Sequence, residues 1–135
     1  MTKVAIVYHS GFGHTKLQAE AVHAGAASLD GVDATLFTSQ QATDNLDALD
    51  AYDAIIFGSP TYMGSMSADI KGFFEKAAGK WFTQAWKDKV SGVFTNSTSF
   101  SGDKLNTQVG MLINAMQQGM IHVSLGLLPA HNNPD

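Results

Sequence analysis

Apolar residues occur in five short runs along this chain, and stretches of more mixed composition separate them. The runs lie at residues 4–8, 34–37, 54–58, 90–95 and 121–127. Several are apolar throughout, which is typical of strands that are buried on both faces of a sheet. We therefore predict five strands.

Between these runs, apolar residues recur at helical spacing. The pattern predicts helices over 15–29, 68–78 and 104–118, and a short, weak helix over 45–49. Strands and helices then alternate, which favours an α/β fold with a doubly wound five-stranded parallel sheet and helices on both faces. We find no repeat, low-complexity run or internal linker, so we expect a single domain over residues 1–135.

The end of the sequence departs from this layout. Only about eight residues follow the fifth run, too few for the C-terminal helix that normally closes such a sheet. Either the natural chain continues beyond this point, or a partner subunit covers that face of the sheet. We favour the first explanation, a C-terminal truncation.

Composition narrows the possible chemistry. The chain is 44% hydrophobic and carries a net charge of −4, so we expect a globular domain that does not bind nucleic acid. All eight basic residues are Lys, and a phosphate must therefore be held by backbone amides, hydroxyls, Lys or His. Cysteine is absent, which excludes disulfides and thiolate catalysis. No two histidines have the spacing of a metal site. We see no signal peptide or membrane-spanning run, and we therefore expect a cytoplasmic protein.

The first candidate site is Ser10-Gly11-Phe12-Gly13-His14-Thr15, between the first strand and the first helix. A helix N-terminus of this kind presents N–H groups and a positive dipole end to an anion. The loop lacks the Gly-Lys-Ser/Thr ending of a P-loop, and Lys16 replaces the third glycine of a dinucleotide fingerprint. It suits a terminal phosphate monoester. The alternative is a plain turn in which Ser or Thr caps the helix.

Two further loops follow the third and fourth strands. The first, residues 58–67, contains Tyr62 and Met63, which offer flat apolar surface, and Gly64, which lets a planar ring approach. Its alternative is a connecting loop in which Ser65 or Ser67 caps the next helix. The second, residues 95–103, is dense in small hydrogen-bonding groups; its alternative is a solvent-exposed loop.

All three loops are expected at the carboxyl ends of parallel strands, where open α/β sheets bind ligands. One site for a phosphate, a flat ring and a polar ring edge explains them together. A mononucleotide has these parts, and flavin mononucleotide (FMN) fits them best.

The same residues resemble a known family. The loop at residues 10–15, the segment Gly58-Ser59-Pro60-Thr61-Tyr62-Met63-Gly64 and the triplet Phe94-Thr95-Asn96 are similar to motifs of the flavodoxin-like NAD(P)H:quinone oxidoreductases and FMN reductases, especially the tryptophan-repressor-binding flavoproteins. The resemblance covers residues 3–127. It implies a flavodoxin-like fold, FMN as cofactor, NADH or NADPH as co-substrate, a quinone-like acceptor and a homo-oligomer.

The resemblance also implies a set of cofactor-binding residues. These are Ser10, Phe12, Gly13, His14 and Thr15 at the phosphate, Pro60, Thr61, Tyr62, Met63 and Gly64 at the ring, and Thr95, Asn96, Thr98 and Gly102 on its other side. Two residues have a further role to consider. His131 is a possible substrate contact, and Trp81 matches a family aromatic near a neighbouring subunit's flavin, or else is a core tryptophan. No protein side chain is expected to be catalytic, because the flavin carries the chemistry. The alternatives are a flavodoxin-type electron carrier and a non-catalytic FMN-binding module.

Overall fold

Parallel strands form the centre of the molecule, which we describe over residues 1–132 of a computed structural model. The sheet has the order β2-β1-β3-β5-β6, and a short strand, β4, pairs antiparallel with the end of β3. The strands are β1 (Thr2–Tyr8), β2 (Val32–Thr38), β3 (Ala54–Tyr62), β4 (Ser65–Met66), β5 (Val90–Asn96) and β6 (Ile121–His122). This is the doubly wound α/β arrangement that the sequence pattern predicts.

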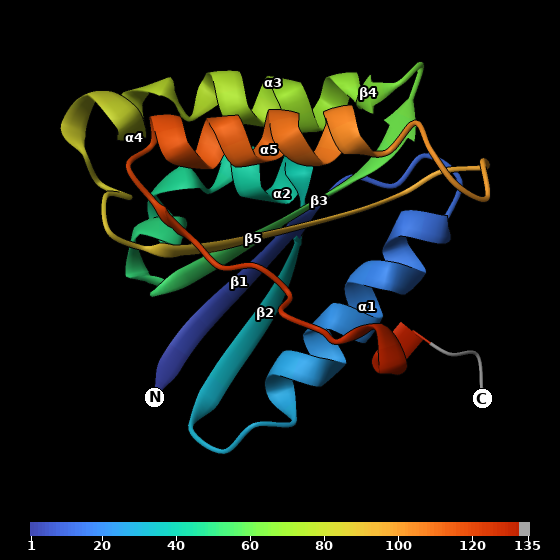
Figure 1. Ribbon diagram of the computed structural model, residues 1–135. Coiled ribbons are helices and arrows are strands. Elements are labelled where there is room, and N and C mark those ends of the chain that lie inside the picture. The colour runs from blue at the N-terminus through green and yellow to red at the C-terminus, as the bar shows by residue number, and fades with distance from the viewer. Residues whose placement is uncertain (133–135) are drawn as a thin grey trace.

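Helices cover both faces of the sheet, as Figure 1 shows: α2, α3 and α5 lie on one face, and α1 lies on the other. The helical elements are α1 (His14–Ala27), α2 (Ser39–Asp44), α3 (Ala68–Lys76), α4 (Ala78–Thr83), α5 (Leu105–Gln117) and the 3₁₀ turns η1 (Leu46–Ala51) and η2 (Pro129–Asn132). None of the helices within residues 1–132 has the length and apolar character needed to cross a membrane.

The larger core cluster lies under α3 and α5 and is rich in aromatic rings. Phe57 of β3 packs edge-on against Phe74, with ring centroids 5.1 Å apart, and Phe73 stacks on Trp86 at 6.2 Å. The Trp86 indole is fully buried and its N–H donates to Asp50 Oδ1 (2.9 Å). Buried aromatic pairs of this kind add about 1 kcal/mol each beyond their buried area. This cluster fixes α3 on the sheet, and α3 carries part of the candidate site.

Several predicted boundaries need correction. The fifth strand, predicted over 121–127, ends at His122, because only residues 121 and 122 pair with β5, opposite Val90 and Ser91. The chain then leaves the sheet and crosses toward α1 (Figure 1), and Gly126, with φ 64°, adopts a conformation that a strand does not contain. An apolar groove of about 760 Å³ lies between α1, α5 and residues 122–125, on the face where the closing helix was expected.

The helical predictions were also incomplete. The helix predicted over 68–78 is interrupted at Ala77 and continues as α4, and the weak helix over 45–49 is the 3₁₀ turn η1. Helix α2 was not predicted, although its capping box is visible in the sequence: Thr38 Oγ1 accepts from Gln41 N (3.2 Å), and Gln41 Oε1 accepts from Thr38 N (2.9 Å). The third strand continues through Pro60 to Tyr62 instead of ending at Gly58.

An ion-pair cluster ties α4 to η1 on the side of the molecule away from the candidate site. Lys80 Nζ lies 2.6 Å from Asp47 Oδ1 and 2.6 Å from Asp50 Oδ2. Burial lowers the pKa of Lys80, but its hydrogen bonds to the two carboxylates outweigh burial and raise the pKa above 10.5. The Lys80 hydrogen bond and charge hold the pKa of Asp47 below 3.8.

Candidate functional site

The three loops singled out in the sequence meet at the carboxyl ends of β1, β3 and β5 (Figure 1). These strands are neighbours in the sheet, so each strand end delivers its loop to the same edge.

The loop after β1 opens α1 without a side-chain cap. The N-cap is Gly13, whose φ of 95° strongly favours glycine, and no acidic residue lies in the first turn. Ser10 Oγ accepts from Gly13 N (3.0 Å), which tightens the loop just before the helix. No Ser or Thr side chain caps α1, so the capping that the plain-turn alternative predicted is not observed. The first N–H groups of α1 point at the loop, as an anion site requires.

Tyr62, at the end of β3, lies over the first loop. A Cβ placed on Gly11 would lie 2.1 Å from the Tyr62 hydroxyl oxygen, so any larger residue at this position would displace the ring. The ring also lies edge-on to Phe12 (6.2 Å between centroids) and to His9 (6.4 Å). Phe12 is itself 83% exposed. The structure thus brings the predicted ring loop and the predicted phosphate loop into direct contact.

Hydrogen bonds between side chains join the third loop to the other two. Thr61 Oγ1 bonds to Thr95 Oγ1 (2.8 Å) and donates to Thr107 Oγ1 of α5 (2.9 Å). Asn96 Nδ2 donates to Thr15 Oγ1 (3.1 Å) and to Gln18 Oε1 (2.9 Å). Thr15, Thr61 and Thr95 are buried, so their hydroxyls hold the loops together beneath the surface of the site.

The outer rim of the site is exposed and contains backbone turns with positive φ. Met63 (φ 51°) and Gly64 (φ 76°) form the tip of the second loop, which Asn106 Nδ2 holds by donating to Gly64 O (2.9 Å). In the third loop, Thr98 and Gly102 are exposed. That loop closes on itself, with Ser97 Oγ donating to Asp103 Oδ1 (2.7 Å). Pro60 is buried in β3, opposite Asn96.

His9 is a site residue that sequence reasoning underrated. Its Nδ1 shares a hydrogen bond with Ser67 Oγ (2.8 Å), and its Nε2 lies 2.7 Å from Asp69 Oδ2. Ser67 is the N-cap of α3 and accepts from Ile70 N (3.4 Å), as the capping alternative for the second loop predicted. His9 ends β1 but contacts the start of α3, the helix that follows the neighbouring strand β3, so no local pattern indicated this contact.

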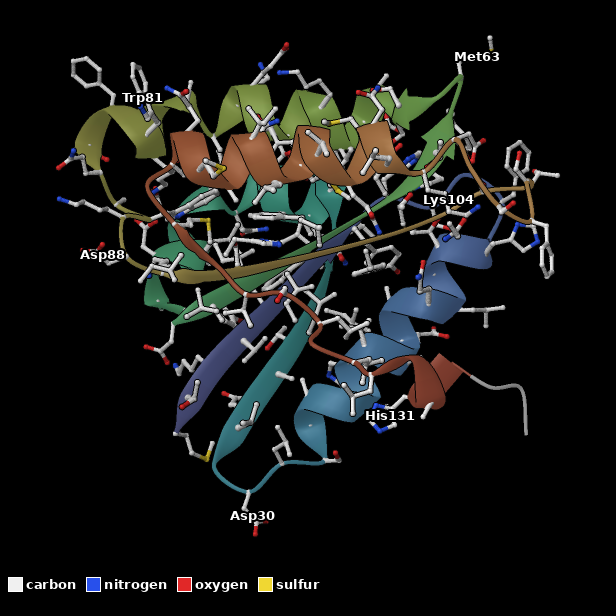
Figure 2. All side chains as sticks on the ribbon, viewed as in Figure 1. Asp30, Met63, Trp81, Asp88, Lys104 and His131 are labelled. Carbon is white, nitrogen blue, oxygen red and sulfur yellow. The ribbon has the colours of Figure 1, made fainter. Side chains whose placement is uncertain are left out.

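Two residues lie apart from the three loops. His131 is in η2, and Figure 2 shows it beside α1, far from Lys104 at the carboxyl edge. It was expected at that edge, and the short β6 is the reason that it is not there. Trp81 is 46% exposed on α4 and contacts the exposed Phe82 edge-on, so it is not a core tryptophan; Trp86 has that role. Within residues 1–132, no three His, Asp or Glu side chains cluster as a metal site would need.

The loop residues fit a bound FMN. An uncapped helix N-terminus without acidic residues is suited to a phosphate, and the Tyr62 ring, which fills the space above Gly11, provides aromatic surface next to it. Ser10, Gly13, His14 and the backbone N–H of Thr15 would hold the phosphate, and Tyr62, Met63 and Gly64 would lie along the ring. Thr98 and Gly102 would face its polar edge, whereas the Asn96 side chain already donates to Thr15 Oγ1 and Gln18 Oε1.

Comparisons with known proteins agree with this geometry. A sequence profile of the NADPH-dependent FMN reductase family matches residues 11–134. The flavodoxin FldP of Pseudomonas aeruginosa is 46% identical over 134 residues, which are 98% of this chain and 71% of that protein. An NAD(P)H dehydrogenase (quinone) of Syntrophobacter fumaroxidans is 34% identical over 145 residues, covering 91% of this chain and 71% of its own length.

Solved structures give the same result. The crystal structure of a flavodoxin, a WrbA-like protein from Agrobacterium tumefaciens, is 47% identical, with a TM-score of 0.83 over 93% of this chain and 79% of that one. An archaeal flavodoxin at 25% identity has a TM-score of 0.75. The fold is therefore flavodoxin-like, as the resemblance implied, and the chain belongs to the NADPH-dependent FMN reductase family.

Proposed function

We propose that this protein is an FMN-dependent oxidoreductase that oxidises NADH or NADPH and reduces a quinone-like acceptor. In the overall reaction the donor gives up a hydride, solvent supplies one proton, and the quinone becomes a quinol. The observation that carries the proposal is the uncapped N-terminus of α1, placed against two loops suited to a planar ring. Family membership supports the same chemistry.

The protein's own part in this reaction is to bind and orient. Bound FMN supplies the hydride and electron chemistry. The α1 N-terminus and Ser10 bind an anion, and Tyr62 and Met63 provide apolar surface beside it. The buried Thr61 and Asn96 networks hold the three loops at fixed separations, which limits the reorganisation needed when a ligand binds.

A steady-state assay tests this proposal. Oxidation of NADH and NADPH is followed at 340 nm with a soluble benzoquinone, and the rate is compared with that of free FMN at the same concentration. We expect the flavin-loaded protein to exceed the free-FMN rate at least 100-fold. A flavin-loaded protein that gives no rate above free FMN would instead be an electron carrier, as the name of FldP says of that protein, or a non-catalytic FMN-binding module. A protein that binds no FMN overturns both.

A matched pair of glycine variants shows whether the first loop matters. Gly13→Ala and Gly31→Ala both place a side chain at positive φ, at 95° and 80°, with no neighbouring atom within 4 Å. The backbone strain is therefore similar, about 1 kcal/mol in each. We expect only Gly13→Ala to weaken FMN binding, because Gly31 lies in the turn before β2.

The quinone acceptor, the cytoplasmic location and the homo-oligomer remain predictions from the sequence.

A further inference from the structure

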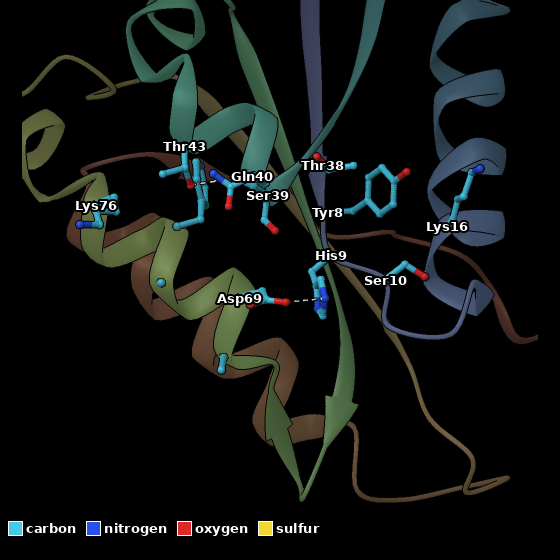
Figure 3. Close-up of a pocket in the computed structure, with 13 residues that line it drawn as sticks. Tyr8, His9, Ser10, Lys16, Thr38, Ser39, Gln40, Thr43, Asp69 and Lys76 are labelled. Carbon is cyan, nitrogen blue, oxygen red and sulfur yellow. Dashed lines mark hydrogen bonds and ion pairs between the residues drawn. The ribbon is translucent and has the colours of Figure 1, made fainter.

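A second recess lies at the same edge of the sheet, on the side of β2 (Figure 3). It has a volume of about 590 Å³ and lies between α2, α3, the end of β1 and the side chain of Lys16. We call it the α2–α3 pocket. Of the predicted cofactor residues, only Ser10 lines it, so it is distinct from the three-loop site. Pockets of this size commonly bind small molecules.

The charged groups of the pocket favour an anion. Lys16 and Lys76 line it, and Asp69 is its one carboxylate. Asp69 already faces His9 Nε2 at 2.7 Å, whereas Lys16 has only a loose, exposed pair with Glu20 at 3.9 Å. No ion pair within residues 1–132 involves Lys76. The ammonium groups of Lys16 and Lys76 are thus available to a ligand. Each can bind a phosphate group as a point charge.

The floor of the pocket is open. It is formed by one side of α3, where Ala68 and Gly72 lie one turn apart. A Cβ on Gly72 would meet no other atom within 4 Å, so space, rather than a neighbouring side chain, lies above the helix. Ser39 is buried in the opposite wall, at the start of α2. A ligand can therefore lie along α3 between Asp69 and Lys76 without displacing the core.

The distance along α3 limits the kind of ligand. Asp69 and Lys76 are seven residues apart, which is about 10 Å along a helix. A single inorganic phosphate cannot reach both. A nucleotide can, since its phosphates suit Lys76 and its ribose hydroxyls or ring amino group can donate to Asp69, with Lys16 across the pocket as a second positive charge. We propose that the α2–α3 pocket binds a nucleotide, with its phosphates on Lys76 and its ribose or base at Asp69.

The pocket also borders the three-loop site. His9 lines the pocket and its ring lies edge-on to Tyr62, 6.4 Å between centroids. If the proposed function holds, the nicotinamide donor is one source of such a nucleotide, with its phosphates in the pocket and its ring directed past Tyr62. A free nucleotide that regulates the enzyme is the other source. The chemistry of the pocket is the same in both cases.

Calorimetric titration of the FMN-loaded protein with ADP tests the pocket directly. Gly72→Leu fills the open floor and improves helix propensity, so the fold is preserved. Lys76→Gln removes one ammonium group. We expect Gly72→Leu to abolish ADP binding and Lys76→Gln to weaken it about tenfold, as the loss of one charge-assisted contact does. Neither change should alter FMN affinity.

Matched controls exist on the same face of the fold. Gly79→Leu makes the same change on α4, where a Cβ also meets nothing within 4 Å, and Lys71→Gln removes an exposed ammonium from α3 outside the pocket. Both controls should bind ADP as the wild type does. The proposal is overturned if ADP does not bind the wild type, or if Gly72→Leu and Lys76→Gln bind it unchanged.

Inhibition of NADH oxidation by ADP separates the two sources. Competitive inhibition, together with a raised KM for NADH in Gly72→Leu, identifies the donor as the ligand. Non-competitive inhibition identifies a regulatory nucleotide. If the protein has no NADH oxidation at all but ADP binds in the way described, the proposed function fails and the pocket stands. If oxidation occurs while ADP does not bind, only the pocket proposal fails.

Discussion

The hydroxyl of Thr61 offers a direct test of how the site is held together. It is joined to Thr95 at 2.8 Å and donates to Thr107 at 2.9 Å, and thereby links β3, β5 and α5. Thr61→Val keeps the shape of the side chain and removes this link. Thr107 is fully buried, and no other hydrogen bond reaches its hydroxyl from the described residues, so the variant leaves that group without a partner.

The expected cost follows from these contacts. An orphaned buried hydroxyl costs about 1–3 kcal/mol, and each lost hydrogen bond contributes about 1 kcal/mol. We therefore expect Thr61→Val to lower the free energy of unfolding by about 2–3 kcal/mol, measured by urea denaturation with an unchanged m-value. Thr83→Val, in which an exposed hydroxyl on α4 loses its bond to Gly79 O, should cost less than about 0.5 kcal/mol.

The double variant decides whether the reasoning is right. Adding Thr107→Val to Thr61→Val removes the orphaned hydroxyl and should restore at least about 1 kcal/mol. FMN affinity should change less than fivefold, because the Thr61 hydroxyl faces the protein interior. A cost below about 0.5 kcal/mol for Thr61→Val, or a further loss on adding Thr107→Val, would refute this account.

Three other predictions concern single contacts. Gly11→Ala should displace the Tyr62 ring, since the new Cβ would lie 2.1 Å from its hydroxyl oxygen, and should weaken FMN binding about tenfold in a fluorescence titration; unchanged affinity contradicts the contact. Asn96→Ala should lower the free energy of unfolding by about 1–2 kcal/mol by releasing Thr15 and Gln18, and an unchanged urea midpoint would exclude this role. Lys80→Met should destabilise the protein mainly between about pH 4 and 10.5. The raised Lys80 pKa makes its contribution present below 10.5 and lost above it, and the lowered Asp47 pKa makes its contribution present above 3.8 and lost as the pH falls further. Equal destabilisation at pH 2.5 and pH 7 would contradict this.

The sequence pattern was sufficient for the sheet and for the positions of its loops. Buried strands contain mainly apolar residues, so the runs in β1, β3 and β5 were visible, and parallel topology then brings their carboxyl ends to one edge. The sequence pattern was insufficient for the end of β6, because an apolar run predicts that a segment is buried but not which strand pairs with it. Residues 123–127 are apolar in the sequence at alternate positions, yet only Val123 N still bonds to β5, at Ser91 O (2.9 Å).

Within the site, residue type indicated the chemistry but not the direction of each side chain. Thr61 and Thr95 were predicted as cofactor contacts from hydroxyl-rich loops, and their hydroxyls bond to each other instead. His9 was not among the predicted site residues, because its partners Ser67 and Asp69 are 58 and 60 positions away along the chain. Such long-range pairs depend on packing that local patterns do not encode.

The central claim is that the α1 N-terminus holds the phosphate of FMN. The most direct measurement is the dissociation constant of FMN compared with that of riboflavin, which has the same ring and ribityl chain but no phosphate, by quenching of flavin fluorescence. We predict that FMN binds at least 100-fold more tightly, about 2.7 kcal/mol from the phosphate alone. Equal affinities for the two flavins, or no binding of either, would contradict the account.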